Sequence, residues 1–301
     1  MLSTFIDLAK GVGIALVITL VGLALIWRRS PASRAAASTY DPFRASLLSA
    51  LLIAITLPLS ILLGFAKPTF PPVSAVDWPV LFAFAGGIVG IVGALLAPRR
   101  PHAKPRTAGL AVFALLHLLL LALVAGAMRT QFSGPHAGAA IATAAAIGAA
   151  GTLVSLGFRA ACASPGAIAP LLIVIVGTTS SLAAVLTGNI GSPTIYGIAC
   201  ACVGPAFLVA LWRPAAALAA AFTGPAWLFA ALCIVTTVIG ETPWWCAGLN
   251  ALAALMVYVS GLGALGRLAG VKAWAARLSL VGAPALAAVI IAAMNQPEPY
   301  A

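Results

Sequence analysis

Long apolar runs dominate this sequence and limit its fold more than any other feature. A run of about 18 or more apolar residues is long enough to cross a bilayer as an α-helix. Allowing about four residues of tolerance at each end, the predicted spans are 5–27, 46–66, 78–97, 108–127, 137–157, 168–189, 193–212, 215–239, 244–266 and 276–294. The sequence therefore predicts an all-α, polytopic transmembrane bundle of about ten helices, within a range of 8 to 10, in which residues 1–301 form one integral membrane domain.

Composition supports the membrane class and excludes a soluble domain. Hydrophobic residues make up 63% of the chain and charged residues 7%, whereas a soluble domain carries about 25% charged residues. The net charge of +11 lies in short loops between the runs. In that position it favours contact with anionic lipid headgroups over nucleic acid.

The basic residues are unevenly distributed between alternate loops. Of the 16 Lys and Arg residues, 13 lie in the loops that follow odd-numbered spans: Arg28, Arg29, Arg34, Arg44, Arg99, Arg100, Lys104, Arg106, Arg159, Arg213, Arg267, Lys272 and Arg277. The other side has Lys10, Lys67 and Arg129. Because positive loops stay in the cytoplasm, both termini are predicted to be extracytoplasmic. Two termini on the same side of the membrane require an even number of spans. The predicted location is the inner or plasma membrane.

Tryptophans mark several predicted span ends. Trp27 and Trp212 each precede an arginine at a cytoplasmic end, while Trp78, Trp244 and Trp245 lie at outer ends. Indole rings settle at headgroup depth, so we expect these residues to be interfacial anchors.

No Asp or Glu lies well inside a predicted span. Proton and cation pumps usually place ionisable groups there, and a membrane metalloenzyme needs several carboxylate or imidazole ligands. The spacing of the five cysteines is not a metal-binding pattern. We therefore expect no enzyme, no metal and no cofactor, and no proton coupling through an intramembrane carboxylate.

His117 is the one ionisable residue near the middle of a predicted span. Burial of an imidazole without a partner is costly, so the ring needs a hydrogen bond from another helix. Three interpretations are open: a packing histidine, a group that handles substrate or protons, and a haem or metal ligand completed by another subunit.

Uncharged polar residues gather in the sixth and ninth predicted spans. The sixth span carries Thr178, Thr179 and Ser181, and the ninth carries Asn250 and Tyr258. Hydroxyls can bond back to their own helix and serve packing, or they can line a cavity. We take these five residues and His117 as candidates for a substrate cavity.

Four prolines interrupt apolar runs, at Pro58, Pro205, Pro225 and Pro284. A proline inside a helix removes one hydrogen bond and bends the helix, and broken helices near the midplane often mark transporter sites. We therefore predict helix hinges at these positions. A weak internal repeat, approximately 46–160 and 165–266, is suggested by Leu51–Ile55 and Leu171–Ile175.

Glycines offer points of close helix contact. Gly86, Gly90 and Gly93 in the third span and Gly261 in the ninth have no side chain to keep a neighbouring helix away.

These observations predict a permease for a small uncharged or weakly polar solute. The alternative is a non-catalytic structural or assembly subunit of a membrane complex, which would explain the apolar interior equally well. A membrane protein partner or a homo-oligomer is compatible with either.

Overall fold

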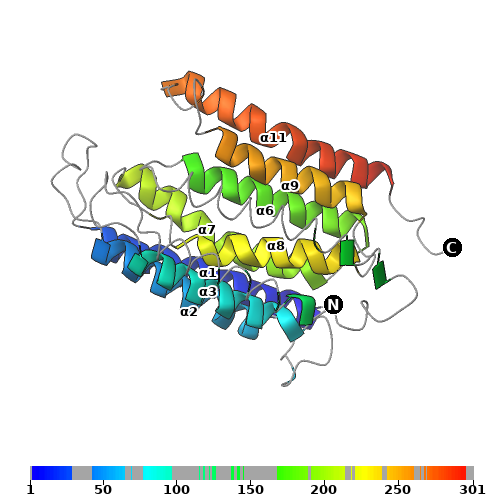
Figure 1. Cartoon of the computed structure of the whole chain (residues 1–301). Helices are drawn as coiled ribbons and strands as arrows, with labels where there is room; N and C mark the ends of the chain where they lie inside the picture. Colours follow the sequence, from blue (N-terminus) through cyan, green and yellow to red (C-terminus); the bar gives the residue numbers. More distant parts are fainter. Residues whose placement is uncertain are drawn as a thin grey trace.

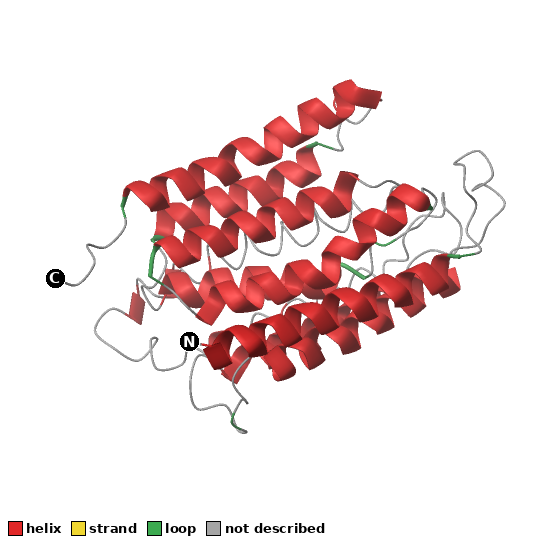
Figure 2. Ribbon diagram, turned by 180° about the vertical axis from the view of Figure 1, so that it is seen from behind, coloured by secondary structure: helices red, strands yellow, loops and turns green. Residues whose placement is uncertain are grey.

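The computed structural model describes a subset of the chain, and all structural statements below concern that subset. It comprises residues 2–28, 43–64, 69, 77–96, 115, 118, 122, 124–126, 137–138, 141–142, 145, 168–188, 191–213, 218, 221–238, 243–260, 265, 268 and 270–295. Its elements are α-helices, and this part of the chain contains no strand (Figure 2). The all-α class predicted from the sequence is confirmed for these residues.

Eight helices are described. They are α1 (Leu2–Trp27), α2 (Phe43–Gly64), α3 (Trp78–Leu96), α6 (Ile168–Leu186), α7 (Gly191–Trp212), α8 (Thr223–Val238), α9 (Trp244–Val259) and α11 (Gly270–Met294). Each overlaps a predicted span, although α8 begins eight residues later than predicted (223 against 215) and α11 six residues earlier (270 against 276). The fourth and fifth predicted spans lie mostly outside the described residues, although the isolated positions described between 115 and 145 are helical.

Five of these helices are long and apolar enough to cross a membrane. They contain the segments Ala9–Trp27, Phe43–Gly64, Trp78–Leu95, Ser192–Trp212 and Gly270–Met294. Three further apolar segments, Pro170–Leu186, Gly224–Cys233 and Trp244–Val257, are shorter. The protein is therefore a multi-helix membrane protein, while the predicted total of about ten spans stays a prediction.

The helices form two groups of three with a pair between them (Figure 1). Helices α1, α2 and α3 make one group, in which α2 packs on both neighbours. Helices α6, α9 and α11 make the other group. Helix α7 packs against α1 and α6, and α8 packs against α3, so the central pair joins the two groups.

Specific contacts fix the directions of the helices. The end of α1 meets the beginning of α2, because Trp27 Nε1 donates a hydrogen bond to Ser49 Oγ at 2.9 Å. Gly11 in the first half of α1 abuts Ile198 in the first half of α7, and the two helices begin at the same end of the bundle (Figure 1). Helices α1 and α7 are therefore parallel, and α1 and α2 are antiparallel.

The beginning of α1 and the end of α11 lie at the same end of the bundle (Figure 1). We call this the terminal end. Ala183 near the end of α6, Cys246 near the beginning of α9 and Ala292 near the end of α11 form one buried cluster there. The even number of spans stays a prediction. Which side of the membrane holds this end stays a prediction.

Glycines bring α3 close to its neighbours. A Cβ added to Gly86 would lie 3.0 Å from the carbonyl oxygen of Gly224, and one added to Gly87 would lie 2.8 Å from Ala54 Cβ. Backbones approach this closely only where the side chain is missing. The close contact predicted at Gly86 is confirmed.

Three sequence-based placements differ from the structure. Pro225 lies in the first turn of α8, which begins at Thr223, and a proline is tolerated there because the first-turn N–H groups have no partner inside the helix. Lys272 and Arg277 belong to α11 and not to the preceding loop, since both residue types are good helix formers. Trp27 is fully buried, so it is not an interfacial anchor.

Candidate functional site

The hydroxyls of α6 point in different directions. Ser181 Oγ donates to the carbonyl oxygen of Pro193 at 3.1 Å, and Thr178 Oγ1 lies 3.9 Å from Cys200 Sγ. Both partners belong to α7, which is antiparallel to α6 and packs closely against it. These two residues therefore link α6 to α7, with Thr178 exposed on its outer side.

Thr179 within α6 and Thr187 directly after it bond to backbone carbonyls of α6. Thr179 Oγ1 lies 2.9 Å from the carbonyl oxygen of Ile175 and 3.1 Å from that of Val176. Thr187 repeats this arrangement at 3.1 Å from the carbonyl oxygens of Ala183 and Ala184. Such bonds satisfy a hydroxyl in an apolar environment, and they leave its oxygen able to accept a further bond.

Asn250 of α9 carries a buried amide oxygen that receives no hydrogen bond from the residues that the structure describes. An unsatisfied buried acceptor costs about 1–3 kcal/mol, and a hydrocarbon environment offers no water to satisfy it. Ser60 Oγ on α2 is in the same state, but it lies in the opposite group of helices.

The register between α6 and α9 places Asn250 level with Thr179. Ala183 of α6 and Cys246 of α9 share the buried cluster at the terminal end, and these helices run in opposite directions. Ala292 of α11 belongs to the same cluster, and Cys246 Sγ lies 3.6 Å from the carbonyl oxygen of Ala288 on α11. Thr179 lies one turn before Ala183 and Asn250 one turn after Cys246, so the two residues lie at about the same depth within the α6–α9–α11 group.

A second polar group, not expected from the sequence, lies where α6, α7 and α8 meet. Tyr196 of α7 packs against Phe229 of α8 with ring centroids 5.4 Å apart, and its hydroxyl lies 3.5 Å from the Phe229 carbonyl oxygen. Cys200 lies one turn along α7, with its Sγ 3.9 Å from the carbonyl oxygen of Val174. Gly177 makes room for this packing, since its Cβ would lie 2.7 Å from Phe229 Cζ. The i, i+4 spacing of Tyr196 and Cys200 puts both residues on one face of a helix, and this spacing is visible in the sequence.

Three of the predicted hinge prolines lie inside helices. Pro58 is in α2, Pro205 in α7 and Pro284 in α11. Each removes the hydrogen bond that the carbonyl four residues earlier would otherwise accept. Pro205 is the one nearest the candidate residues, because α7 is the helix that contacts Thr178 and Ser181.

Two candidates cannot be placed. His117 lies outside the described residues, and for Tyr258 the structure describes the backbone within α9 alone. The structure places Thr178, Thr179 and Ser181 on α6 and Asn250 on the neighbouring α9, and a shared substrate cavity stays a prediction.

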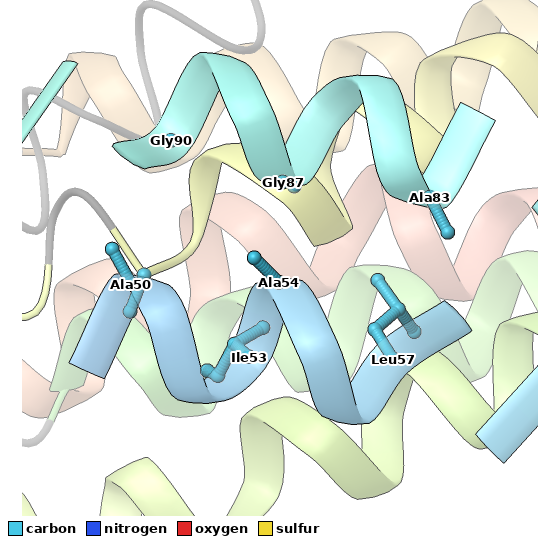
Figure 3. A pocket seen from close by; sticks show the side chains of 9 residues that line it. Ala50, Ile53, Ala54, Leu57, Ala83, Gly87 and Gly90 are labelled. Carbon is cyan, nitrogen blue, oxygen red and sulfur yellow. The ribbon is translucent and has the colours of Figure 1, made fainter. Parts of the chain in front are cut away.

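A pocket lies away from these residues, between α2, α3 and the beginning of α8 (Figure 3). It is too narrow to admit a water molecule. Small apolar residues line it, among them Ala54, Gly87 and Gly224. Its lining lacks polar side chains, so it offers no group that would orient a solute.

The described part of the chain contains no cluster of three or more His, Cys, Asp or Glu residues suited to a metal ion. Comparison with known proteins gives no relative: no protein-family model matches the chain, and neither a curated protein nor a solved structure is significantly similar to it. The site must therefore be interpreted from its own geometry.

Proposed function

We propose that this protein is a permease for a small uncharged or weakly polar solute, with its path between α6, α7 and α9. The observation that carries the proposal is the buried amide oxygen of Asn250, to which no residue in the described part of the chain donates a hydrogen bond. A solute hydroxyl or amide passing at this depth would supply the missing donor. Thr179, one turn from the α6–α9 contact, would supply an acceptor.

The arrangement of helices supports this proposal. Two groups of three helices are joined through α7 and α8, and α7 carries Pro205 in its interior. Transporters alternate access by moving one helix group against another around a fixed site near the midplane. In this protein the α1–α2–α3 group and the α6–α9–α11 group would be the moving parts, with α7 bending at Pro205.

The proposal includes no catalytic chemistry. Neither Thr179 nor Asn250 titrates near neutral pH, so these two residues would not couple transport to proton movement. The solute gradient or a second protein would drive transport. The location would be the inner or plasma membrane.

The test uses the purified protein in liposomes and a panel of small uncharged solutes, including glycerol, urea and a neutral amino-acid amide. We expect the wild type to accelerate entry of at least one solute, and the double variant Thr179→Val, Asn250→Leu to reduce that rate about tenfold or more, as expected for two lost hydrogen bonds. Thr187→Val is the matched control, because Thr187 makes the same backbone bonds on α6 but lies two turns away. If the wild-type protein does not accelerate the entry of any solute in the panel, the proposal is wrong.

A second candidate function rests on a different observation. The α6 hydroxyls bond to backbone carbonyls, and the pocket in Figure 3 excludes water, which together suit a closely packed structural subunit of a membrane complex. Co-purification of the tagged protein with one stoichiometric membrane partner, combined with no solute entry in liposomes, would favour this function.

A further inference from the structure

Several side chains of the α6–α9–α11 group direct their polar hydrogen to a backbone carbonyl. Thr179 donates within α6 at 2.9 Å, and Ser181 donates to a carbonyl of α7 at 3.1 Å. On α9, Cys246 Sγ lies 3.6 Å from the carbonyl oxygen of Ala288 on α11. A hydrogen that is already given to a carbonyl is not available to a solute, so the oxygens of Thr179 and Ser181 can only accept a further bond.

Asn250 adds an acceptor that lacks a donor. Of the two polar atoms of its amide, the oxygen is the one that is buried with no partner among the residues that the structure describes. A buried acceptor in this state is unfavourable, and a hydrocarbon environment supplies no water to relieve it. What this position needs is therefore a hydrogen-bond donor.

Helix α11 provides a second acceptor at a similar depth. Pro284 has no N–H, so the carbonyl oxygen of Leu280 lacks the donor that position 284 would otherwise provide. Helices α9 and α11 pack against each other in opposite directions, and the contact between Cys246 and Ala288 sets their register. Asn250 lies one turn after Cys246, and Pro284 lies one turn before Ala288. The Leu280 carbonyl is therefore about one helical turn from the depth of Asn250.

The surroundings of Asn250 favour a neutral donor over a cation. Neither α6 nor α9 contains an acidic or basic residue, so neither helix offers a charge to offset that of a buried cation, whose burial without a counter-charge is costly. The groups with unmet capacity at this depth are oxygen acceptors, and an uncharged N–H group satisfies such an acceptor without bringing in a charge.

We infer that the Asn250 site selects small neutral amides of the urea kind, in which N–H donors outnumber oxygen acceptors. One N–H of the solute would bond to the amide oxygen of Asn250 while another bonds to the Leu280 carbonyl or to Thr179 Oγ1. The inference rests on the proposed function, since it names the class of solute that the permease would carry.

The experiment measures urea entry into liposomes that contain the full-length protein, with acetamide or acetone as a competitor. The two competitors have nearly the same shape, but acetone has a methyl group in place of the NH₂ group and donates no hydrogen bond. We expect the wild type to accelerate urea entry, acetamide to slow that entry, and acetone at the same concentration to leave it unchanged. Glycerol entry is measured in parallel.

A proline substitution connects the selectivity to α11. Pro284→Ala gives position 284 an N–H that satisfies the Leu280 carbonyl. It should raise the acetamide concentration that halves urea entry by about threefold or more, as expected for one lost hydrogen bond. A change in helix bending alone would alter the maximal rate and not this concentration. Pro58→Ala is the matched control, because Pro58 lies inside α2 in the opposite group of helices.

The outcomes separate this inference from the proposed function. Accelerated glycerol entry with no effect on urea would overturn the inference and leave the permease in place. Equal inhibition by acetone and acetamide would also overturn it, as would the same loss of acetamide inhibition in Pro58→Ala as in Pro284→Ala. If no solute enters faster, the proposed function fails and the inference fails with it. Should Pro284→Ala fail to fold, the comparison of the two competitors on the wild type decides.

Discussion

Trp27 and Trp212 have the same local sequence but different environments. Each ends a helix and precedes an arginine, which is why both were predicted to be interfacial anchors. Trp27 is 0% exposed and donates to Ser49 Oγ, which in turn donates to the carbonyl oxygen of Ala45 at 2.8 Å. Trp212 is stacked under Arg213 and exposed. The difference depends on α2, which covers the end of α1, and no local pattern encodes it.

We expect Trp27→Phe to lower the free energy of unfolding by about 1–3 kcal/mol. The substitution removes the hydrogen bond to Ser49 and leaves space in a closed core. Trp212→Phe should change the same quantity by less than about 0.5 kcal/mol, because an exposed ring loses little packing. Denaturant unfolding in detergent, followed by circular dichroism, measures both. Equal losses in the two variants would contradict the assigned burial of Trp27.

Asp77 is a second residue whose role depends on tertiary contacts. It directly precedes an apolar run, and it is 5% exposed. Its carboxylate accepts hydrogen bonds from Thr69 N at 2.9 Å and Thr69 Oγ1 at 2.8 Å. It lies directly before α3, where a carboxylate also favours the positive end of the helix dipole.

Replacing Asp77 with Ala should therefore lower the free energy of unfolding by about 1–2 kcal/mol, the usual cost of a lost helix cap. Asp77→Asn keeps the hydrogen-bonding shape and should lose less. The midpoint of thermal unfolding in detergent is the measurement. A larger loss for Asn than for Ala would contradict a capping role.

At the scale of helices, length and apolar character were sufficient to locate each described element. The starts of helices were less certain, because alanine-rich sequence continues before α8 without a change in hydropathy. The start of α8 is marked in the sequence by Thr223, Gly224 and Pro225. A proline near the beginning of an apolar run fits best in the first turn of a helix. Helix pairing was beyond prediction, because many faces of these helices are equally apolar.

Glycine substitutions test the pairing of α2 with α3. Gly87→Ala should lower the free energy of unfolding by about 1–3 kcal/mol, because its Cβ would lie 2.8 Å from Ala54 Cβ and 3.0 Å from Ala54 Cα. Gly13→Ala is the control: nothing lies within 4 Å of its added Cβ, so helix propensity should make it neutral or stabilising by up to about 1 kcal/mol. Unfolding in detergent separates them, and a destabilising Gly13→Ala with a neutral Gly87→Ala would contradict the helix contact.

The candidate site was predictable in its residue types but not in its geometry. Clustered hydroxyls on the sixth span were visible in the sequence, whereas their division between α7 contacts and self-bonding depends on helix rotation. Asn250 was identified as polar, but its missing donor is a property of the folded chain. The Tyr196–Phe229 contact joins residues from two helices, so no single span could reveal it.

At the scale of the whole molecule, the charge distribution and the helix directions concern the same property, which is the end of the bundle at which each helix begins. Charge predicts both termini on one side of the membrane. Among the described residues, the beginning of α1 and the end of α11 lie at the terminal end, and the end of α3 and the beginning of α6 lie at the opposite end (Figure 1).

Orientation follows if the positive end is cytoplasmic, and a pair of single cysteines tests it. Trp244 begins α9 at the terminal end and is 76% exposed, whereas Val271 begins α11 at the opposite end and is 84% exposed. Neither substitution alters charge. In a variant without native cysteines, a membrane-impermeant maleimide added to intact cells should label Trp244→Cys, and it should label Val271→Cys after permeabilisation alone. Labelling of Val271→Cys alone in intact cells would show that the protein has the opposite orientation in the membrane, with α9 and α11 still antiparallel. Labelling of both in intact cells would contradict the arrangement of α9 and α11 as antiparallel spans, because two sites at opposite ends of a bundle cannot both face the outside of an intact membrane.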